Sequence, residues 1–419
     1  MTKKLVVIGQ GYVGLPLAEA AVEAGYAVSG LDVSQSLVDG LNSGVSHIDD
    51  ISDGAVQTML AGGYRATTDA SVITDADVVV ICVPTPLTDG GGPDLGAVDS
   101  ASRMIATNWG GPTLVVLEST TYPGTTDGFL LPLLEAGGAV LGQDLFLAFS
   151  PERVDPGSEE FDIRNTPKLV GGSDEGSTKR AFEFYSAFID EVVTLKGTRE
   201  AETAKLLENT YRHVNIALVN EMAKFCHELG IDIWEVIRGA ATKPFGFQAF
   251  TPGPGVGGHC IPIDPNYLSY EVRKQLGYPF RFVELAQEIN NSMPWYVASR
   301  IAELLNDVGR PVRGSRILLL GATYKKNISD QRESPSAPLA RRLLTLGADL
   351  SFHDPFVERW NLTDTGLDRV EDLTAAVSQA DIVVLLQAHD FYAPEEIAAA
   401  SSIFFDTRGV TCSDVARRL

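Results

Sequence analysis

The sequence predicts an α/β protein in which two Rossmann-like, doubly wound domains are joined by a long central helix and a helical domain. Three observations predict this class. Buried-strand runs alternate with helix-like segments at both ends of the chain, a glycine-rich turn follows the first strand, and an apolar stripe of helical period lies between the ends. We expect domains over residues 1–198, 199–305 and 306–419, which 419 residues with 44% hydrophobic content can supply with ordinary cores.

The strand pattern is that of a doubly wound parallel sheet, and it occurs twice. In the first third of the chain the clearest strands are expected at residues 5–8, 27–31, 78–83 and 113–117. The C-terminal part has them at residues 316–320, 350–352, 381–386 and 403–406. In both halves the second strand ends in an aspartate, Asp32 or Asp354. Two nucleotide-type folds flanking a different domain are the simplest architecture for this pattern.

The middle of the chain is predicted to form one long helix over about residues 199–230. Its apolar residues recur every three or four positions and form a stripe of Leu207, Tyr211, Val214, Leu218, Met222, Phe225 and Leu229. Lys205, Asn209 and His213 are spaced by four and share a different, polar face. The helical pattern continues to about residue 305, interrupted by the Pro/Gly-rich segment 251–265. Such a helix can join two domains and carry site residues or a dimer interface.

The composition excludes several classes of partner. A formal charge of −22 argues against general nucleic-acid binding, which needs a basic face. The four cysteines have neither paired nor metal-ligand spacing and the six histidines form no cluster, so we expect a reducing compartment and no metal site. No run of about 18 apolar residues occurs, and the first apolar run is five residues long. We therefore expect a cytoplasmic protein without a membrane span.

The first candidate site is the turn Gly-Gln-Gly-Tyr-Val-Gly at residues 9–14. It follows a short apolar strand and opens a helix-like run, where glycines permit a tight turn, the approach of a pyrophosphate and close helix packing. Asp32, 18 residues after Gly14, is placed to accept the hydrogen bonds of a ribose 2′-hydroxyl. No basic residue follows it directly, so NAD is preferred over NADP. The expected cofactor contacts here are Gly9, Gly11, Tyr12, Val13, Gly14 and Asp32.

Three further polar stretches end predicted strands, at residues 82–86, 118–124 and 150–153. Ligands in such folds bind at the carboxyl ends of strands, so these residues are site candidates. Ordinary turn chemistry also uses Pro, Ser and Thr, and that alternative stays open. Cys82 lies in or at the end of a buried strand, so core packing is its expected role.

Cys260 stands on a glycine-rich loop, with Asp264 four residues later. Glycines leave no Cβ bulk around the sulfur and leave backbone N–H groups open, so a thiolate can be stabilised and approached there. The alternative for a free cysteine is a small buried hydrophobe. Lys205 offers an ammonium for a developing oxyanion, or is a solvated helix lysine. The polar loop 325–334 either grips phosphates or is a charged surface loop.

These pieces, in this order, resemble the UDP-glucose/GDP-mannose dehydrogenase family over essentially the whole chain. The matching motifs are GQGYVGLPL at residues 9–17, CVPTP at 82–86, SPER at 150–153, ETAKLLEN at 202–209, GGHCIPIDP at 257–265 and KKNISDQRES at 325–334. The resemblance implies an N-terminal NAD domain, a central helical region that forms a homodimer, and a C-terminal domain that binds the UDP part of a UDP-sugar. It also implies oxidation of a sugar C6 alcohol to a carboxylate with two NAD, through a thiohemiacetal and a thioester on Cys260.

The resemblance also assigns roles to single residues. Lys205 corresponds to the lysine that stabilises the oxyanion, and Asn209 to its partner one turn on. Asp264 corresponds to the aspartate that orders water and proton transfer near the thiol. Thr120 corresponds to the water-orienting threonine, and Glu152 to the glutamate of thioester hydrolysis. Further implied contacts are Pro84, Thr85, Thr120 and Arg332 on NAD, and Glu152, Arg153, Lys205, Asn209, Gly257, Lys325 and Arg408 on the substrate.

The substrate is narrowed by departures from the motifs usual in UDP-glucose dehydrogenases. The sequences at residues 150–157 and 257–265 resemble the branch that acts on UDP-N-acetylhexosamines. Residues 242–247 resemble enzymes for UDP-N-acetylglucosamine or its galacto epimer, so we expect UDP-N-acetylglucosamine. UDP-N-acetylmannosamine, UDP-N-acetylgalactosamine and UDP-glucose are alternatives for the same chemistry. A two-electron 2-hydroxyacid or 6-phosphogluconate-like dehydrogenase and a non-catalytic nucleotide-sugar sensor are alternatives of other classes.

Overall fold

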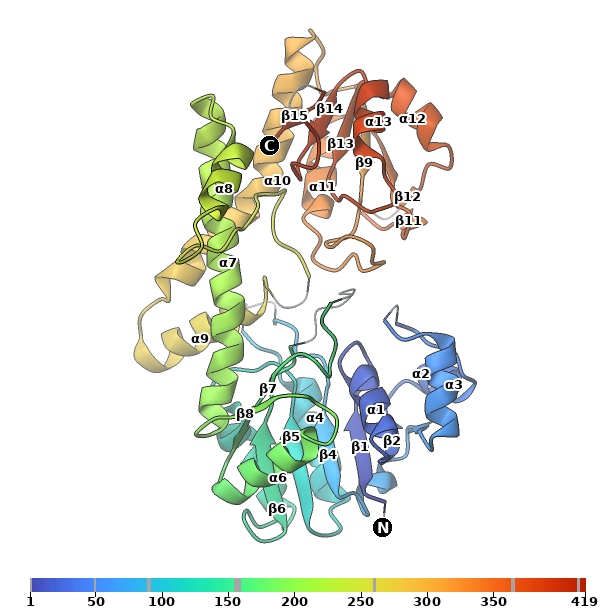
Figure 1. Ribbon diagram of the computed structural model, residues 1–419, viewed down its shortest axis with the longest axis vertical. Coiled ribbons are helices and arrows are strands. Elements are labelled where there is room, and N and C mark those ends of the chain that lie inside the picture. The colour runs from blue at the N-terminus through green and yellow to red at the C-terminus, as the bar shows by residue number, and fades with distance from the viewer. Residues whose placement is uncertain are drawn as a thin grey trace. The chain divides into compact units, whose positions relative to one another are not determined.

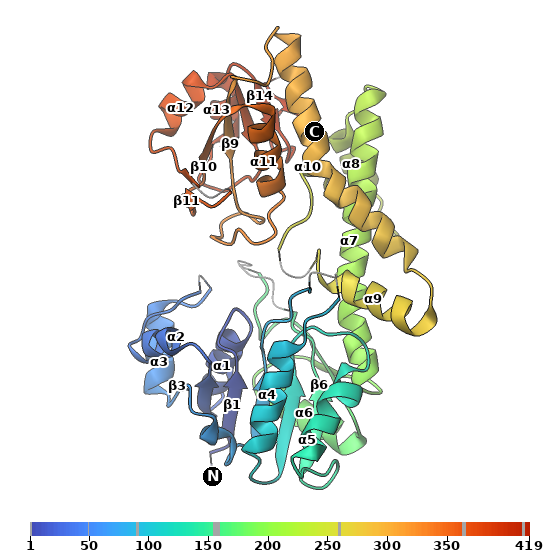
Figure 2. The same cartoon turned by 180° about the vertical axis from the view of Figure 1, so that it is seen from behind.

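The computed structural model describes residues 2–48, 50–88, 92–153, 160–258, 261–362, 366–412 and 415–419. The chain divides into two compact units, each built around its own sheet (Figures 1 and 2). The first unit comprises residues 1–208 and 266–277, and the second comprises residues 209–265 and 278–419. The predicted α/β class with two Rossmann-like sheets is confirmed, and the three domain boundaries stay a prediction.

The first unit is built on an eight-stranded sheet in the order β3-β2-β1-β4-β5-β6-β7-β8. Its strands are β1 (Lys4–Ile8), β2 (Ala27–Leu31), β3 (Arg65–Thr67), β4 (Val78–Ile81), β5 (Thr113–Leu117), β6 (Leu145–Phe149), β7 (Lys168–Gly172) and β8 (Val192–Thr194). β7 runs antiparallel to β6, and β8 is parallel to β7. The carboxyl ends of β1 to β6 therefore share one edge of the sheet, and those of β7 and β8 lie at the other.

Helices cover both faces of this sheet because its strands are apolar on both sides. Leu5 and Val7 pack into one core with α1 (Gly14–Glu23), α2 (Gln35–Asn42), α3 (Asp53–Ala61) and α6 (Glu175–Tyr185). Val6 and Ile8, which point the other way, pack into a second core with α4 (Gly96–Thr107) and α5 (Leu131–Ala136). Two short helical turns, η1 (Ala70–Ile73) and η2 (Thr126–Leu130), and most of α9 (Asp264–Leu276) complete the unit.

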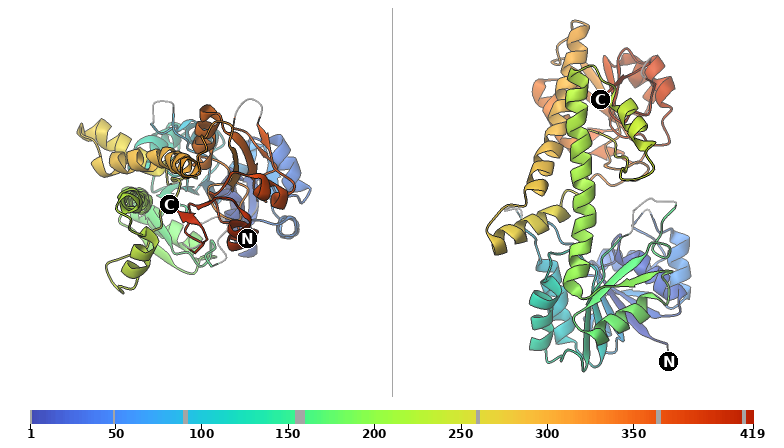
Figure 3. Two further views of the ribbon diagram at one scale, coloured as in Figure 1. Left: turned by 90° about the horizontal axis from the view of Figure 1, so that it is seen from above. Right: turned by 60° about the vertical axis from the view of Figure 1, so that its left-hand side comes forward.

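The long central helix is confirmed as α7 (Thr198–Glu228), which Figure 3 shows unbroken. Its faces are used in an unusual way. Lys205 and Asn209 on the polar face are only 6% and 9% exposed, whereas Leu218 and Phe225 of the apolar stripe are 53% and 45% exposed. A surface helix normally buries its apolar side, because this removes apolar area from water. The inversion makes the buried polar face a candidate site and the exposed stripe a candidate interface.

The second unit is built on a five-stranded parallel sheet in the order β10-β9-β13-β14-β15. Its strands are β9 (Arg316–Leu320), β10 (Asp349–His353), β13 (Ile382–Leu385), β14 (Phe404–Asp406) and β15 (Arg417–Arg418), with a separate hairpin of β11 (Arg359–Trp360) and β12 (Leu367–Asp368). Its helices, besides the later part of α7, are α8 (Ile233–Ala241), α10 (Arg281–Asp307), α11 (Ser336–Leu346), α12 (Leu373–Gln379) and α13 (Pro394–Ala400).

The strands predicted in both halves coincide with β1, β2, β4, β5, β9, β10, β13 and β14, with ends displaced by at most two residues. The largest displacement is in β4, which was predicted to reach Val83 but ends at Ile81. The carbonyl oxygen of Val83 accepts the hydroxyl of Ser119 at 2.7 Å instead of a ladder hydrogen bond. Among the described residues, no helix combines the length and apolar character needed to cross a lipid bilayer.

Candidate active site

The turn after β1 has the geometry of a dinucleotide-binding loop. Gly9 has a φ of +91°, and a Cβ there would lie 2.6 Å from the carbonyl oxygen of Cys82. A Cβ on Gly14 would lie 1.9 Å from the carbonyl oxygen of Gly9, so only glycine allows α1 to begin this close to the turn. Apart from its chain neighbours, no described residue has an atom within 4 Å of the Cβ position of Gly11, which leaves its backbone open to a pyrophosphate.

Asp32, directly after β2, is oriented by two backbone hydrogen bonds. Its Oδ2 accepts the N–H of Gln10 at 2.9 Å, and its Oδ1 accepts the N–H of Ser34 at 3.0 Å. Tyr12 and Val13, directly before α1, are partly buried against the core. In the part of the chain that the structure describes, no side chain caps α1, so the N–H groups of its first turn can meet phosphate oxygens. These residues fit NAD, with the carboxylate at the ribose and the helix N-terminus at the pyrophosphate.

The loops after β4 and β5 are tied together at the same edge of the sheet. Thr85 donates its hydroxyl to the carbonyl oxygen of Thr120 at 2.8 Å, and Pro84 is exposed. Cys82 is buried in the core, and burial raises the pKa of its thiol well above the usual value. The prediction that Cys82 is a packing residue is therefore confirmed.

Thr121 is a candidate that our sequence interpretation passed over in favour of Thr120. Its side chain is fully buried, and its Oγ1 has no hydrogen-bond partner within the described part of the chain. A buried hydroxyl without a partner is costly unless a water or ligand satisfies it. The adjacent pair of threonines was the available signal, but the sequence does not show which hydroxyl turns inward.

Glu202, on the first part of α7, anchors the loop that follows these threonines. Its carboxylate accepts the N–H of Gly124, and it accepts both the N–H and the hydroxyl of Thr126, at 2.9 Å and 2.7 Å. Burial raises the pKa of Glu202 to about 7, against the lowering effect of these hydrogen bonds. The loop after β5 is thus fixed to the helix that carries Lys205.

Lys205 is buried, and its ammonium donates a hydrogen bond to the carbonyl oxygen of Glu152. It is therefore not a solvated helix lysine, and the cost of burying its charge is reduced by this contact. Arg153, the next residue after Glu152, forms a two-pronged ion pair with Glu208 and donates to the carbonyl oxygen of Pro167 at 2.7 Å. In this arrangement Arg153 holds its own loop against α7.

A buried ion pair lies under the same edge of the sheet. Lys168 Nζ is 2.9 Å from Glu118 Oε2, and the hydroxyl of Tyr185 donates to the other oxygen of Glu118. Burial raises the pKa of Glu118, while Lys168 acts in the opposite direction. Lys168 was not singled out from the sequence, because its partner lies 50 residues away in the chain.

In the second unit, Asn209 donates its side-chain amide to the carboxylate of Asp264. Both side chains are at least nine-tenths buried. Cys260 and its neighbour His259 lie outside the described residues. The structure therefore gives the surroundings of the predicted thiol loop on both sides of Cys260 but not the thiol itself.

The glycines before Cys260 permit close packing against the polar loop 325–334 and its flanks. A Cβ on Gly257 would lie 2.7 Å from the carbonyl oxygen of Glu333, and one on Gly258 would lie 2.7 Å from the ring of Tyr324. The N–H of Gly258 also donates to the carbonyl oxygen of Arg332 at 3.3 Å. These glycines therefore let two candidate loops approach backbone to backbone.

A buried polar network supports the start of the same segment. Asn220 accepts the N–H of Gly253 at 2.9 Å and donates to Asn290 at 2.9 Å, and Asn290 in turn lies 3.3 Å from Nδ1 of His213. Burial lowers the pKa of His213 to about 4, so its ring is neutral near pH 7. α7 and α10 together thus position the backbone leading to Cys260.

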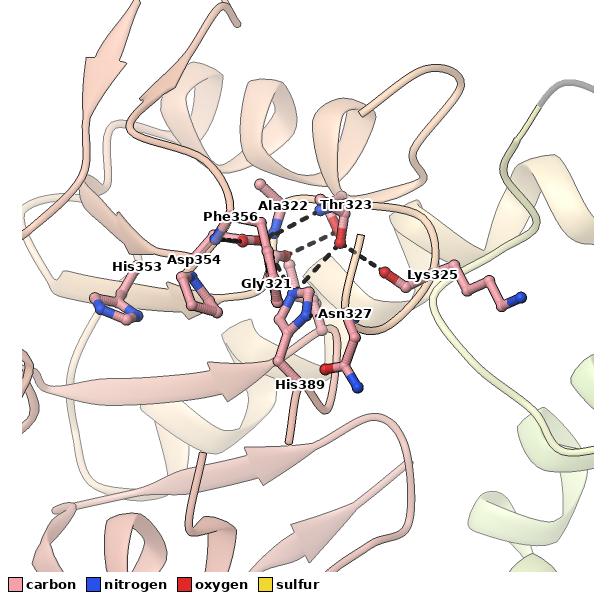
Figure 4. Close-up of polar contacts among 12 residues, drawn as sticks. Gly321, Ala322, Thr323, Lys325, Asn327, His353, Asp354, Phe356 and His389 are labelled. Carbon is pink, nitrogen blue, oxygen red and sulfur yellow. Dashed lines mark hydrogen bonds and ion pairs between the residues drawn. The ribbon is translucent and has the colours of Figure 1, made fainter. Parts of the chain in front are cut away.

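The three candidate cations of the C-terminal part have different surroundings. Arg332 forms a two-pronged ion pair with Asp330, at 2.8 Å and 2.6 Å. Arg408 donates to the carbonyl oxygen of Leu386 at 2.6 Å, and burial lowers its pKa to about 10. Lys325 stands on the loop after β9, and Figure 4 shows its side chain pointing away from the polar cluster beneath that loop.

A separate cavity of about 690 Å³ lies at the other edge of the first sheet, beside Gly172 at the end of β7 and Thr194 at the end of β8. None of the residues predicted from sequence lines it. The carboxyl ends of β1 to β6, the expected ligand edge, carry the candidates instead.

The fold and the first site define an NAD-dependent dehydrogenase. Three sequence profiles of the UDP-glucose/GDP-mannose dehydrogenase family match the chain: the NAD binding domain over residues 3–189, the central domain over 199–292 and the UDP binding domain over 318–413. The chain therefore belongs to this family of NAD-dependent nucleotide-sugar oxidoreductases. The family, fold class, cofactor and enzyme class predicted from the sequence are confirmed.

Similar proteins match over nearly their whole length. The chain is 34% identical over 422 residues to the UDP-N-acetyl-D-mannosamine dehydrogenase of Methanococcus maripaludis, covering 97% of this chain and 93% of that protein. The structure of UDP-D-ManNAc dehydrogenase from Pyrococcus horikoshii is similar with a TM-score of 0.90 and 31% identity, over 99% of this chain and 98% of that one. The NDP-N-acetyl-D-galactosaminuronic acid dehydrogenase of Methanosarcina mazei Go1 has a TM-score of 0.82 and 32% identity, over 99% and 92%.

Proposed function

We propose that this chain oxidises the C6 hydroxyl of a UDP-N-acetylhexosamine to a carboxylate, with Cys260 as the covalent nucleophile. The hydrogen bond between Asn209 and Asp264 is the observation that carries the proposal. It joins the amide of Asn209 to a buried carboxylate that stands only four residues along the chain from Cys260, and a thiol mechanism needs groups for proton transfer. The names of the similar proteins and the match to a UDP binding domain support a nucleotide-sugar substrate.

The proposed chemistry takes two hydrides from one carbon, and NAD accepts each of them. In the first oxidation C6 loses a hydride and the hydroxyl loses its proton, which leaves an aldehyde. The thiolate of Cys260 adds to the aldehyde carbon, and the new oxyanion takes up a proton to give a thiohemiacetal. Loss of the second hydride and of that proton gives a thioester. Water then attacks the thioester carbon, releasing the carboxylate and restoring the thiol.

The roles proposed for the polar groups follow from their charge and burial. Lys205, a buried ammonium, stabilises the oxyanion formed when the thiolate or water adds, and Asn209 assists it. Asp264 exchanges the proton of the reacting oxygen. Glu152 and a threonine after β5, Thr120 or Thr121, orient the water for hydrolysis. The unpartnered hydroxyl of Thr121 favours that residue.

Binding roles are proposed for the remaining candidates. The proposed contacts with NAD are Gly9, Gly11, Tyr12, Val13, Gly14, Asp32, Pro84, Thr85, Thr120 and Arg332. The proposed contacts with the UDP-sugar are Glu152, Arg153, Lys205, Asn209, Gly257, Lys325 and Arg408. Cations are needed at the diphosphate because the chain as a whole carries a charge of −22. We also propose a homodimer formed through the exposed apolar stripe of α7.

Two sugars are supported by different observations. The sequence at residues 242–247, directly after α8, favours UDP-N-acetylglucosamine as the substrate. The names of the relatives from Methanococcus maripaludis and Pyrococcus horikoshii favour UDP-N-acetylmannosamine, which differs only in configuration at C2. We take UDP-N-acetylglucosamine as the first candidate and UDP-N-acetylmannosamine as the second.

The test is the amount of NADH formed per sugar consumed, with limiting sugar and excess NAD, across the gluco, manno, galacto and UDP-glucose substrates. Two NADH from one sugar would support the double oxidation and identify the substrate, whereas one NADH would overturn it. Cys260→Ser should abolish release of the acid. The control is Cys412→Ser, which makes the same substitution at a different cysteine and should leave release of the acid intact. Tight binding of NAD and UDP-sugar without NADH would instead favour a non-catalytic sensor.

A further inference from the structure

A buried carboxylate lies at the carboxyl edge of the second sheet, between the ends of β9 and β10 (Figure 4). Asp354 is fully buried. Its Oδ2 accepts the N–H of Ala322 at 2.7 Å, and its Oδ1 accepts the N–H of Phe356 at 2.9 Å. Nε2 of His389 lies 3.1 Å from the same Oδ2. The carboxylate therefore fixes the start of the loop that follows β9 and binds a histidine as well.

The proton on His389 is located by the partners on the two sides of its ring. On one side Nε2 lies near Asp354 and 3.3 Å from the hydroxyl oxygen of Thr323. The backbone N–H of Asn327 donates to Nδ1 of His389 at 2.9 Å. A ring nitrogen that accepts a hydrogen bond carries no proton, so the neutral ring has its proton on Nε2 and donates it to Asp354. The imidazole, which is 1% exposed, thus links a buried carboxylate to the backbone of an outer loop.

The backbone that His389 contacts has an uncommon conformation. Asn327 has a φ of +60°, in the left-handed region that non-glycine residues seldom adopt. Its Oδ1 accepts the N–H of Asp390 at 3.0 Å, and its Nδ2 donates to the carboxylate of Asp390. The carbonyl oxygen of Lys325, two residues earlier, accepts the hydroxyl of Thr323 at 2.8 Å. The short segment from Lys325 to Asn327 is therefore held at both ends.

We infer that His389 is a positioning residue for nucleotide binding. By accepting the N–H of Asn327 while donating to Asp354, it sets the backbone from which Lys325 presents its ammonium to the diphosphate of the UDP-sugar. The inference rests on the proposed function, because Lys325 is a substrate contact only there. A ring that merely satisfied Asp354 would need no acceptor on its other side, and a preorganised backbone is what a phosphate-binding lysine requires.

Two substitutions separate these roles, because each keeps one of the two histidine contacts. In His389→Asn the side-chain oxygen takes the place of Nδ1 and can still accept from Asn327, while the donor to Asp354 is lost. In His389→Gln the side-chain nitrogen takes the place of Nε2 and can still donate to Asp354, while the acceptor for Asn327 is lost. The pair is therefore a matched test of the two sides of the ring.

The measurement is the dissociation constant of UDP and of NAD for the full chain by calorimetry, with kcat and KM for the UDP-sugar. For His389→Gln we expect UDP to bind about tenfold more weakly and KM to rise in parallel, with kcat and NAD binding within about twofold of the original. For His389→Asn we expect UDP affinity within about threefold of the original despite a lower melting temperature. Unchanged UDP affinity in a folded His389→Gln protein would overturn the inference.

Asn327 provides a second test that does not disturb the core. Asn327→Gly keeps the N–H and tolerates the left-handed φ, whereas Asn327→Ala disfavours it. We expect weaker UDP binding only for the alanine variant, and equal affinities in the two would overturn the inference. Lys325→Ala separates this result from the proposed function. If that variant binds UDP as well as the original protein does, the proposed contact of Lys325 fails, whatever His389 does.

Discussion

The side-chain amide of Asn209 donates a hydrogen bond to the carboxylate of Asp264, and both groups are buried. One residue stands on α7 and the other begins α9, so the bond joins the central helix to the segment that carries Cys260. A buried polar group that loses its hydrogen-bond partner is costly to keep buried. The bond is therefore expected to orient Asp264.

We predict that Asn209→Ala lowers kcat by roughly 10- to 100-fold, as expected when a hydrogen bond to a catalytic acid or base is lost. The check is kcat of Asn209→Ala beside Asp264→Asn and the double variant. If the effects of the two single changes simply add, the two residues do not act as a pair.

A second prediction concerns the buried ammonium of Lys205. Lys205→Met preserves the length and apolar stem of the side chain but removes the charge that donates to Glu152. We expect kcat to fall by about 100- to 1,000-fold, the usual cost of losing one donor to a developing oxyanion, with NAD binding unchanged.

The matched control is Lys224→Met on the same helix. Lys224 donates to Ser292 at 2.6 Å and belongs to none of the proposed contacts. This variant should keep kcat within about twofold of the original, since one such hydrogen bond affects stability more than chemistry. Equal losses in the two variants would show that Lys205 acts only through the packing of α7.

The parts of the fold that the sequence predicted are those with local signals. The segment from β1 to β2 was predicted because Gly9, Gly14 and Asp32 each mark a turn or strand end by residue type alone. The reversed strands β7 and β8 were not predicted, since an antiparallel return is decided by which strand lies alongside, not by the strand's own pattern. Short strands such as β3 leave too few residues for a period to emerge.

The residues of the candidate site were also predicted where the sequence carries a local signal and missed where it does not. Lys205, Asn209 and Asp264 were found because they belong to motifs. Lys168 lies outside these motifs, and Glu202 begins one of them but was given no role. The burial of both depends on partners 50 and 76 residues distant in the chain. The sequence also predicted a polar face on α7 without showing that it lies inside. A polar helix face can be recognised as buried only when the groups that form hydrogen bonds with it are known.

Glu202 supplies a prediction on stability. Its pKa is raised from 4.5 to about 7 by burial, so between these values the native chain holds a proton that the unfolded chain has lost. The unfolding free energy should therefore fall as pH rises through this window and level off above pH 7, by up to about 3 kcal/mol for this group. Glu202→Gln should remove that part of the slope.

The measurement is urea unfolding at several pH values between 5 and 8 for the original protein, Glu202→Gln and Glu200→Gln. The side chain of Glu200 is exposed in the first turn of the same helix and serves as the control. Its substitution should leave the slope unchanged, because this side chain is not buried. A slope in Glu202→Gln as steep as in the original protein would contradict the assignment.

The last prediction concerns the exposed stripe on α7. Tyr211, Leu218 and Phe225 are spaced by seven residues, so they lie on one line of the helix, and each is 45% to 53% exposed. Apolar side chains aligned in this way are typical of an interface with another chain. We expect Leu218→Asp to shift the protein from dimer to monomer at micromolar concentration, because it would bury a charge without a partner.

Light scattering after size-exclusion chromatography would measure the mass of each variant in solution. The control is Val45→Asp, at a 51% exposed site in the first unit. If the original protein is already a monomer, or if both variants keep its mass, this stripe is not a dimer interface.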